Sequence, residues 1–231
     1  MVRLKCYIGV MVDKKIIIYV LCYDDKTEEF AKTYYQHYDW ARIYRIKKQS
    51  HLFEGVMYQS ELLDLYNEWK DVDYVGTISH SFLAKMKIEQ LLQFLYMSNP
   101  HLHDVIFFKT LASDLFHLHS NPDLKRVYQE IYRQTMPVRT SYIIKRYAFY
   151  NYWIAKPSFM LRYIQFFNNV WLPVVEKHPL IWNNAGYDDE KLSPEILREL
   201  TKKVSHYPMH PFINERIPFP FFKEINARLL F

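Results

Sequence analysis

A polar cluster that follows a short apolar run is the part of the chain best placed to bind a ligand. The segment from Tyr58 to Phe82 reads YQSELLDLYNEWKDVDYVGTISHSF, in which the apolar run YVGTI leads into Ser79, His80 and Ser81. In open α/β sheets the groups that touch ligand lie just beyond the carboxyl ends of the strands. We therefore expect Ser79, His80 and Ser81, which carry two hydroxyls and an imidazole, to line a site.

A charged pair near the end of the chain stands in an otherwise apolar segment. The block HPFINERIPFPFF, which begins at His210, places Glu215 and Arg216 among prolines and phenylalanines. A buried carboxylate or guanidinium is costly unless it is paired. Each of these two groups therefore needs a partner, which is either the other group or a ligand.

Two histidine pairs have the spacing that places both imidazoles on one face of a strand. They are His101 with His103, and His117 with His119. Each pair stands beside asparagine, serine or proline in sequence typical of loops, and no cysteine joins them. Structural or surface histidines are therefore favoured over a zinc site.

Alternating strand and helix patterns in the first half of the chain would position these residues. Apolar, β-branched runs predict strands at Ile16 to Cys22, Ile43 to Ile46, Val75 to Ser79 and Val105 to Phe108. Helical spacing predicts helices at Thr27 to Tyr38, with Asp25 or Thr27 as N-cap, at Val56 to Trp69 and at Ile88 to Tyr96. Strands separated by helices imply right-handed crossovers and a mostly parallel sheet.

The second half is richer in helix and in aromatic residues. The only strand predicted there is Asn151 to Ala155. The predicted helices are Pro122 to Gln134, Pro157 to Val175 with proline in its first turn, and Pro194 to Val204 capped by Ser193. We therefore expect an α/β chain whose carboxyl-terminal half is helical.

Length and composition limit what this fold can bind. A chain of 231 residues, half of them apolar, can bury one large core, and no low-complexity stretch divides it. Only four glycines occur, and neither GxGxxG nor GxxxxGK[ST] is present. A bound nucleotide must therefore be held by side chains and backbone at strand ends. The net charge of +5 suits an anionic ligand such as a nucleoside diphosphate, and would also suit a nucleic acid.

The cysteines and the apolar start bear on the compartment. Cys6 and Cys22 have no metal-ligand spacing and fit a reducing environment. Asp13, Lys14 and Lys15 divide the apolar start into two runs, each too short to span a bilayer. We expect no transmembrane segment and a cytoplasmic protein, in a bacterial cell or a virus-infected host.

Three blocks of the sequence together resemble a known family. They are YQSELLDLYNEWKDVDYVGTISHSF, NYWIAKPSFMLRYI and HPFINERIPFPFF, and they cover roughly a quarter of the chain. These blocks resemble glycosyltransferase domains of bacterial capsule gene clusters and of large DNA viruses. In that family a glutamate-bearing helix ends in tryptophan, a D-Y-[VI]-G strand follows, and an H-P-x-x-x-E-R-like block closes the chain.

The resemblance implies a single Rossmann-like domain of the GT-A type over residues 1–231. Residues 1–115 would form the nucleotide-binding half and residues 116–231 the acceptor half. A nucleotide sugar would bind at the end of the first strand, with Cys22, Tyr23 and Asp24 near the base and ribose and with Ser79 and Ser81 beside them. The implied activity is transfer of a hexosyl or deoxyhexosyl group to a glycan or glycoconjugate, as in polysaccharide biosynthesis.

The sequence departs from the family where a metal would bind. The metal-binding aspartates of that fold follow the strand that is YVGTI here, where Ser79-His80-Ser81 stands instead. A required Mg²⁺ or Mn²⁺ is therefore doubted. The one Asp-x-Asp, Asp71-Val72-Asp73, precedes that strand, so a solvated helix-to-strand turn is favoured over a metal site.

The resemblance also assigns roles in catalysis. Glu215 is the first choice for the base that takes the acceptor's proton, because desolvation in its aromatic segment would raise its pKa toward neutrality. Pairing with Arg216 is the competing explanation of Glu215. His80 could donate a hydrogen bond to the leaving diphosphate and so take the role of a metal ion. The alternative is that His80 is only a polar residue at the end of a strand. Asp114 and Asp188 are weaker candidates for the base.

Acceptor binding would fall to residues of the second and third blocks. An exposed Trp153 could stack on a sugar, Asn151 could bond a hydroxyl, and Lys156 could meet phosphate, with His210 and Arg216 nearby. Alternation along NYWIAK sends Asn151 and Trp153 to one face of the strand and Lys156 to the other. Only one of the two sets can face a cleft, and a buried tryptophan is the commoner outcome.

Three classes of function remain open at this point. A glycosyltransferase predicts saturable binding of a nucleotide sugar and is favoured. A catalytically degenerate relative that binds glycans or acts as a scaffold predicts glycan binding without nucleotide binding. A basic, aromatic nucleic-acid binder predicts affinity that falls steeply with salt, and we do not expect a nucleic-acid partner.

Overall fold

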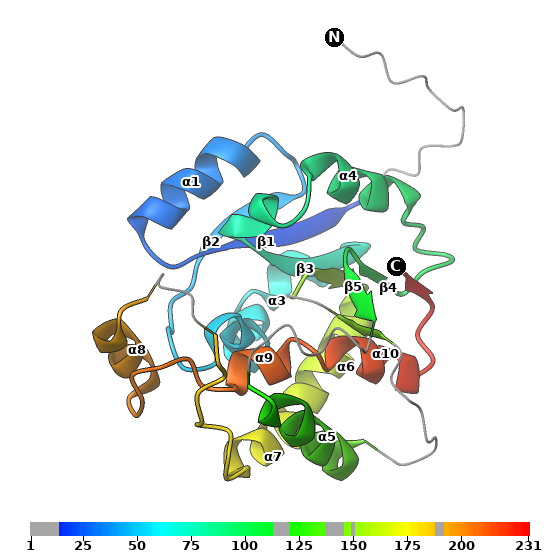
Figure 1. The fold of residues 1–231 in the computed structure, drawn as a ribbon. Coiled ribbons are helices and arrows are strands. Elements are labelled where there is room, and N and C mark those ends of the chain that lie inside the picture. The colour runs from blue at the N-terminus through cyan, green and yellow to red at the C-terminus, as the bar shows by residue number, and fades with distance from the viewer. Residues whose placement is uncertain (1–13, 113–120, 137–145, 149–150, 188–191) are drawn as a thin grey trace.

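A six-stranded mixed sheet forms the centre of the computed structural model (Figure 1). The structure describes residues 14–112, 121–136, 146–148, 151–187 and 192–231. The strand order across the sheet is β2-β1-β3-β7-β4-β8. The strands are β1 (Ile16–Cys22), β2 (Ala41–Arg45), β3 (Tyr74–Ser79), β4 (Val105–Phe107), β7 (Trp153–Ala155) and β8 (Leu229–Leu230). The predicted α/β class with a mostly parallel sheet is confirmed.

The parallel part of the sheet comes from the alternation that the sequence predicts. β1 pairs in parallel with β2 and with β3, and α1 (Asp25–Tyr35) crosses from β1 to β2. β4 pairs in parallel with β8 and follows α4 (Ile88–Met97). β1 is apolar throughout because both its faces are covered, which is the usual pattern of a central parallel strand.

β7 is the one antiparallel strand of this sheet. It pairs with β3 on one side and with β4 on the other. Its amino end therefore lies at the same edge of the sheet as the carboxyl ends of β1 and β3. This close pairing requires a glycine at position 76, since a Cβ there would overlap the carbonyl oxygen of Trp153 and lie 2.7 Å from Ile154 Cγ2.

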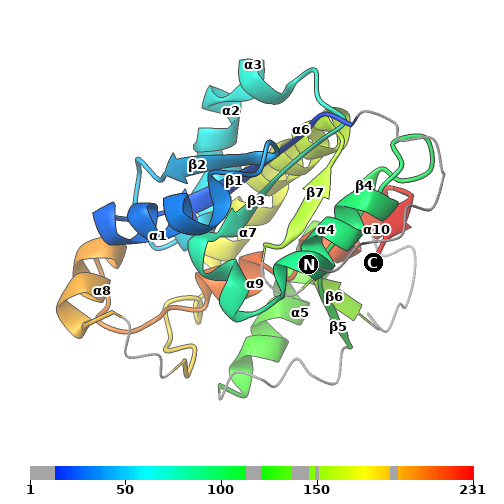
Figure 2. The same cartoon turned by 90° about the horizontal axis from the view of Figure 1, so that it is seen from above.

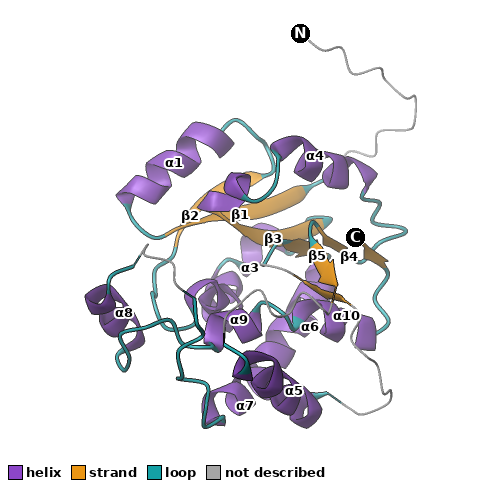
Figure 3. Ribbon diagram, viewed as in Figure 1, coloured by secondary structure: helices purple, strands orange, loops and turns teal. Residues whose placement is uncertain are grey.

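Helices cover the two faces of the sheet, as Figures 2 and 3 show, and an apolar cluster fills the space on each face. Even-numbered residues of β1, such as Ile18 and Val20, pack with α1 and α4 on one face. Odd-numbered residues, such as Tyr19 and Leu21, pack into the larger cluster on the other face. That cluster lies against α5 (Asp123–Thr135), α6 (Pro157–Phe166), α7 (Leu172–Lys177), α9 (His210–Asn214) and α10 (Pro218–Glu224).

The helix predicted from Val56 to Trp69 is wrong as a single element. The chain forms a π turn at Met57–Glu61, then α2 (Leu62–Asp64) and α3 (Tyr66–Trp69). The wide turn carries Glu61 into the interior, where its carboxylate accepts hydrogen bonds from the amides of Lys47 and Lys48. Those bonds explain why the helix is interrupted here, and they could not be predicted from hydrophobic periodicity alone.

The long helix predicted from Pro157 is interrupted by a second π turn. α6 passes through a π turn at Phe167–Trp171 into α7, which ends at Lys177. Pro173 lies in the first turn of α7. Proline has no amide proton and its ring clashes with the carbonyl four residues earlier, so a widened turn before it accommodates the ring.

Helix caps agree with the sequence in one case and differ in another. Ser193 caps α8 (Pro194–Thr201) by accepting a hydrogen bond from the amide of Ile196, as predicted. α1 is capped by Asp24, whereas the sequence predicts Asp25 or Thr27 as the N-cap. Thr27 is the reciprocal partner three residues into the helix, where it completes a capping box.

Short elements are also present in the described part of the chain. They are 3₁₀ turns at Phe53–Gly55 and His80–Ala84 and a separate two-stranded sheet of β5 (Thr110–Ala112) and β6 (Arg146–Ala148). Within the described ranges no helix is long and apolar enough to cross a membrane.

Candidate functional site

The candidate site lies at the edge of the sheet where β1 and β3 end and β7 begins. Leu21 is in register with Ser79, so β1 and β3 end at the same level. Tyr23 and Asp24 follow β1, His80 and Ser81 follow β3, and Asn151 precedes β7. These polar residues therefore gather at one edge, although they come from three distant segments.

Glu54 brings a carboxylate to this edge from the 3₁₀ turn Phe53–Gly55. The Tyr23 hydroxyl donates to Glu54 Oε1 at 3.5 Å, and the buried Asn151 amide donates to Oε2 at 3.4 Å. Glu54 is half-buried as a residue, and both carboxylate oxygens face these inward partners. Burial raises the pKa of Glu54, while the charge of Lys85 and the two hydrogen bonds act against that rise.

Glu215 is the second carboxylate of the site. It follows α9 directly and accepts a hydrogen bond from Arg216 Nη1 at 2.8 Å, and its side chain is only 14 % exposed. Burial raises the pKa of Glu215 to about 7; Arg216 and Lys85 lower it and Glu54 raises it further. Glu215 is therefore poised between its charged and neutral forms near neutral pH.

Lys85 supplies a positive charge that acts on both carboxylates. It follows the 3₁₀ turn His80–Ala84, and its ammonium lies 5.8 Å from the centre of the Tyr152 ring. Its charge lowers the pKa of both Glu54 and Glu215. An ammonium group beside strand ends can also attract an anionic ligand.

The predicted cluster after β3 has a defined local geometry. The Ser79 and Ser81 hydroxyls are 2.7 Å apart, and the Ser81 amide donates to Ser79 Oγ at 3.1 Å. His80 Nδ1 lies 3.3 Å from the carbonyl oxygen of Leu21. A carbonyl only accepts, so Nδ1 carries the proton in this bond and the neutral ring presents Nε2 as an acceptor. Donation by Nε2 to a diphosphate would therefore require the imidazolium form.

Residues after β1 divide between the site and the core. Asp24 is exposed and accepts from the Thr27 amide at 2.7 Å, which lowers the pKa of Asp24. Tyr23 is half-buried, and its ring lies edge-on to His80 at 5.9 Å. The Cys22 thiol is fully buried in the cluster under α1, so only its backbone can contact a ligand, a correction to its predicted part in donor binding.

Two predicted acceptor contacts need correction. Trp153 is fully buried and stacks on Tyr58, with ring centres 5.4 Å apart, so it cannot present a face to a sugar. Because β7 runs antiparallel, Lys156 lies at the opposite edge, where its ammonium pairs with Asp104 at 2.9 Å. Asn151, at the other end of β7, is the member of that segment that reaches the site.

The Asp-x-Asp sequence also lies at the opposite edge. Asp73 immediately precedes β3, and its carboxylate accepts from the Lys15 amide at 2.9 Å, just before β1. Asp71 is exposed. This arrangement matches a helix-to-strand turn with solvated carboxylates.

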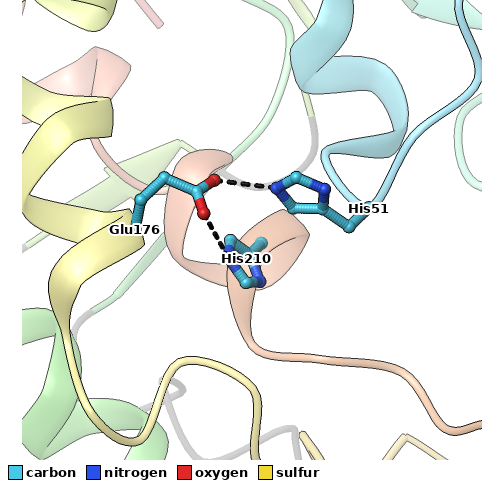
Figure 4. Close-up of side chains that lie close together, drawn as sticks. All are labelled: His51, Glu176 and His210. Carbon is cyan, nitrogen blue, oxygen red and sulfur yellow. Dashed lines mark hydrogen bonds and ion pairs between the residues drawn. The ribbon is translucent and has the colours of Figure 1, made fainter. Parts of the chain in front are cut away.

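His210 lies in a cluster with His51 and Glu176, shown in Figure 4, which sequence reasoning did not find. Glu176 Oε1 is 2.7 Å from His51 Nε2, and Oε2 is 3.5 Å from His210 Nε2. Burial acts to raise the pKa of Glu176, but the two neighbouring histidines lower it to about 2. The three residues come from the segment before Glu54, from α7 and from the start of α9.

Two of the remaining sequence candidates can be placed in the structure, and four lie outside the described ranges. His101 is exposed, and His103 Nδ1 accepts from the Asn99 amide at 3.3 Å. His117, His119, Asp114 and Asp188 lie outside the described residues.

Sequence reasoning missed Glu54 and Lys85. A signal existed for Glu54, since it is a lone carboxylate in the apolar stretch HLFEGVM. Lys85 stands among ordinary surface patterns and becomes notable only through its place after β3.

Comparisons with family models, with curated proteins and with solved structures give no match. The function is therefore argued from the chemistry of the residues at the sheet edge.

Proposed function

We propose that this chain is a glycosyltransferase that moves a sugar from a nucleotide-sugar donor to a glycan or glycoconjugate acceptor, at the edge where β1 and β3 end. The observation that carries the proposal is the pair of inward-facing carboxylates, Glu54 and Glu215, whose pKa values are both lowered by the charge of Lys85. The three sequence blocks that resemble glycosyltransferase domains support it. The proposed compartment is the cytoplasm.

Donor binding is assigned to the strand ends. Parallel strands of open α/β sheets present backbone and polar side chains to ligands at their carboxyl ends. Tyr23 and Asp24 would contact the nucleoside, and the Ser79 and Ser81 hydroxyls would hydrogen-bond the sugar or diphosphate. Lys85 would offset the diphosphate charge.

Transfer itself is assigned to Glu215 as base. The acceptor hydroxyl oxygen attacks the anomeric carbon, and the bond from that carbon to the diphosphate oxygen breaks, so that the nucleoside diphosphate leaves with the electron pair. Glu215 takes the proton from the attacking hydroxyl. A base works best when its pKa is near the working pH, which the burial of Glu215 provides. Attack from the face opposite the leaving group inverts the anomeric centre.

Charge balance in this mechanism does not require a divalent cation. Lys85 and the imidazolium form of His80 would stabilise the leaving diphosphate in place of Mg²⁺ or Mn²⁺. Asp71 and Asp73, the only Asp-x-Asp of the sequence, lie at the far edge. Of the predicted acceptor contacts the proposal keeps Asn151. His210 and Arg216 are buried, and their side chains contact Glu176 and Glu215 respectively, which corrects their predicted part in acceptor binding.

Thermal melting against nucleoside diphosphates and nucleotide sugars, each with Mn²⁺ and with EDTA, tests the proposal. Ligand binding to the native state raises the melting temperature. We expect a shift with one nucleotide that persists in EDTA, is lost in Lys85→Ala and is kept in Asp71→Asn, the matched control at the far edge. Absence of a shift with every nucleotide, together with a shift on adding glycans, would favour a glycan-binding protein instead.

A further inference from the structure

A cluster of two imidazoles and one carboxylate lies beside the sheet-edge site without belonging to it. One ligand atom each from His51, Glu176 and His210 lies within 4.8 Å of the others. In Figure 4 the carboxylate of Glu176 points toward the rings of His51 and His210, and a dashed line joins each ring to one of its two oxygens. The three side chains therefore converge on one small volume.

We propose that His51, Glu176 and His210 bind a divalent transition-metal cation of the zinc type. Imidazole nitrogen and carboxylate oxygen are ordinary zinc ligands, with metal–ligand distances of about 2.0–2.2 Å. Tetrahedral ligands at such distances are about 3.4 Å apart, by the geometry of those bond lengths. The two nitrogen–oxygen separations, 2.7 Å to Oε1 and 3.5 Å to Oε2 of Glu176, bracket that value, and the three ligand atoms all lie within 4.8 Å of one another, so side-chain adjustments would bring them to this spacing.

His210 provides an independent reason to expect a ligand. Its side chain is fully buried, and neither ring nitrogen makes a hydrogen bond with any residue that the structure describes. Its nearest charged group is Glu176, at 3.5 Å. A buried polar group without a close hydrogen-bond partner is costly, and a metal ion bound at Nε2 would replace its long contact with Glu176 by a direct bond.

Access to the cluster is open on the side of His51 and Glu176. The His51 side chain is 23 % exposed and that of Glu176 is 34 % exposed, whereas His210 closes the inner side. Trp182 packs against both imidazoles, with ring centres 5.0 Å from His51 and 4.5 Å from His210. Three protein ligands with one solvent-facing side leave a fourth position for water, as in open zinc sites.

The metal would connect the two segments that carry the carboxylates of the proposed active site. His51 precedes Glu54 by three residues, and His210 begins the helix that Glu215 caps. A cation shared by His51 and His210 therefore fixes the turn that bears Glu54 against α9. The proposed role of the metal is to position these two segments. This role is separate from sugar transfer and does not depend on the identity of the donor.

Zinc binding by the full chain, purified without a histidine tag and stripped with chelator, tests the proposal. We expect calorimetry to show one equivalent of Zn²⁺ that is absent in His51→Gln and in Glu176→Gln. Saturation at a hundred times the dissociation constant would raise the melting temperature by about 5–10 °C for a chain of this length. Co²⁺ bound in the same site should give the visible absorption of a tetrahedral complex.

A neighbouring pair serves as the matched control. His178 Nε2 lies 3.0 Å from Glu130 Oε2, and among the described residues this histidine–carboxylate contact belongs to no group of three possible metal ligands. His178→Gln should keep the equivalent of zinc that His51→Gln loses. Lack of zinc binding by the wild-type protein, or equal binding by wild type, His51→Gln and Glu176→Gln, would overturn the proposal. The nucleotide shifts described above are measured separately, so the two proposals can fail independently.

Discussion

Replacement of Glu215 by glutamine should change how the stability of the protein depends on pH. The side chain is 14 % exposed, and burial raises its pKa from 4.5 to about 7. When the pKa of an acid is higher in the folded state than in the unfolded state, the folded state binds more protons at pH values between the two pKa values. Stability therefore falls as pH rises through that window.

The size of the effect follows from the shift. Each pKa unit is worth about 1.4 kcal/mol, so ionising Glu215 in the folded state costs about 3 kcal/mol between pH 4.5 and pH 8. Glutamine keeps an acceptor for Arg216 and cannot ionise. The free energy of unfolding of wild type should therefore drop by about 3 kcal/mol relative to Glu215→Gln over this range.

Urea denaturation of both proteins across that pH range measures the difference. Glu199→Gln, which removes an exposed glutamate on α8, is the matched control for loss of a surface carboxylate. In a Glu54→Gln background the fall in stability that Glu215 causes should be smaller and should end at lower pH, because removing the Glu54 charge lowers the pKa of Glu215 and narrows the window. A constant difference between wild type and Glu215→Gln at all pH values would refute the assignment of a buried, pKa-shifted carboxyl.

Three further predictions concern the frame of the site. Gly76→Ala should lower the free energy of unfolding by about 3 kcal/mol in urea, because its Cβ would overlap the Trp153 carbonyl of the paired strand. Asp104→Asn should cost about 3 kcal/mol at neutral pH. Hydrogen bonds from Arg228 hold the pKa of Asp104 well below its usual range, so wild-type stability should fall as pH drops below about 4 and the variant should lack that fall. Burial raises the pKa of Cys22 to about 12, so in Cys6→Ser a disulfide reagent should modify the native protein far more slowly than the unfolded one.

Much of the sheet could be predicted because its central strands have a simple pattern. β1 was predicted with the bounds that the structure has, since burial on both faces makes every residue from Ile16 to Cys22 apolar or aromatic. The orientation of β7 could not be predicted in this way. Strand order depends on contacts between distant segments, such as the approach of Trp153 to Gly76, and alternation within NYWIAK is the same in either direction.

The candidate site was only partly visible in the sequence for a similar reason. Glu215 was noticed because a carboxylate in an aromatic segment has few ways to avoid a large desolvation cost. Glu54 depends on Tyr23 and Asn151 for its inward position, and these contacts between distant segments cannot be predicted from local residue spacing. His51 and Glu176 are 125 residues apart in sequence, so only the fold brings them together.

The most direct test of the account is the rate at which Glu215→Gln releases nucleoside diphosphate from the nucleotide sugar that shifts the wild-type melting temperature. If Glu215 is the base, the variant should bind this donor as wild type does and release diphosphate about 10²–10⁴ times more slowly in the presence of acceptor glycans. A variant that binds the donor and turns it over at the wild-type rate would contradict the central claim.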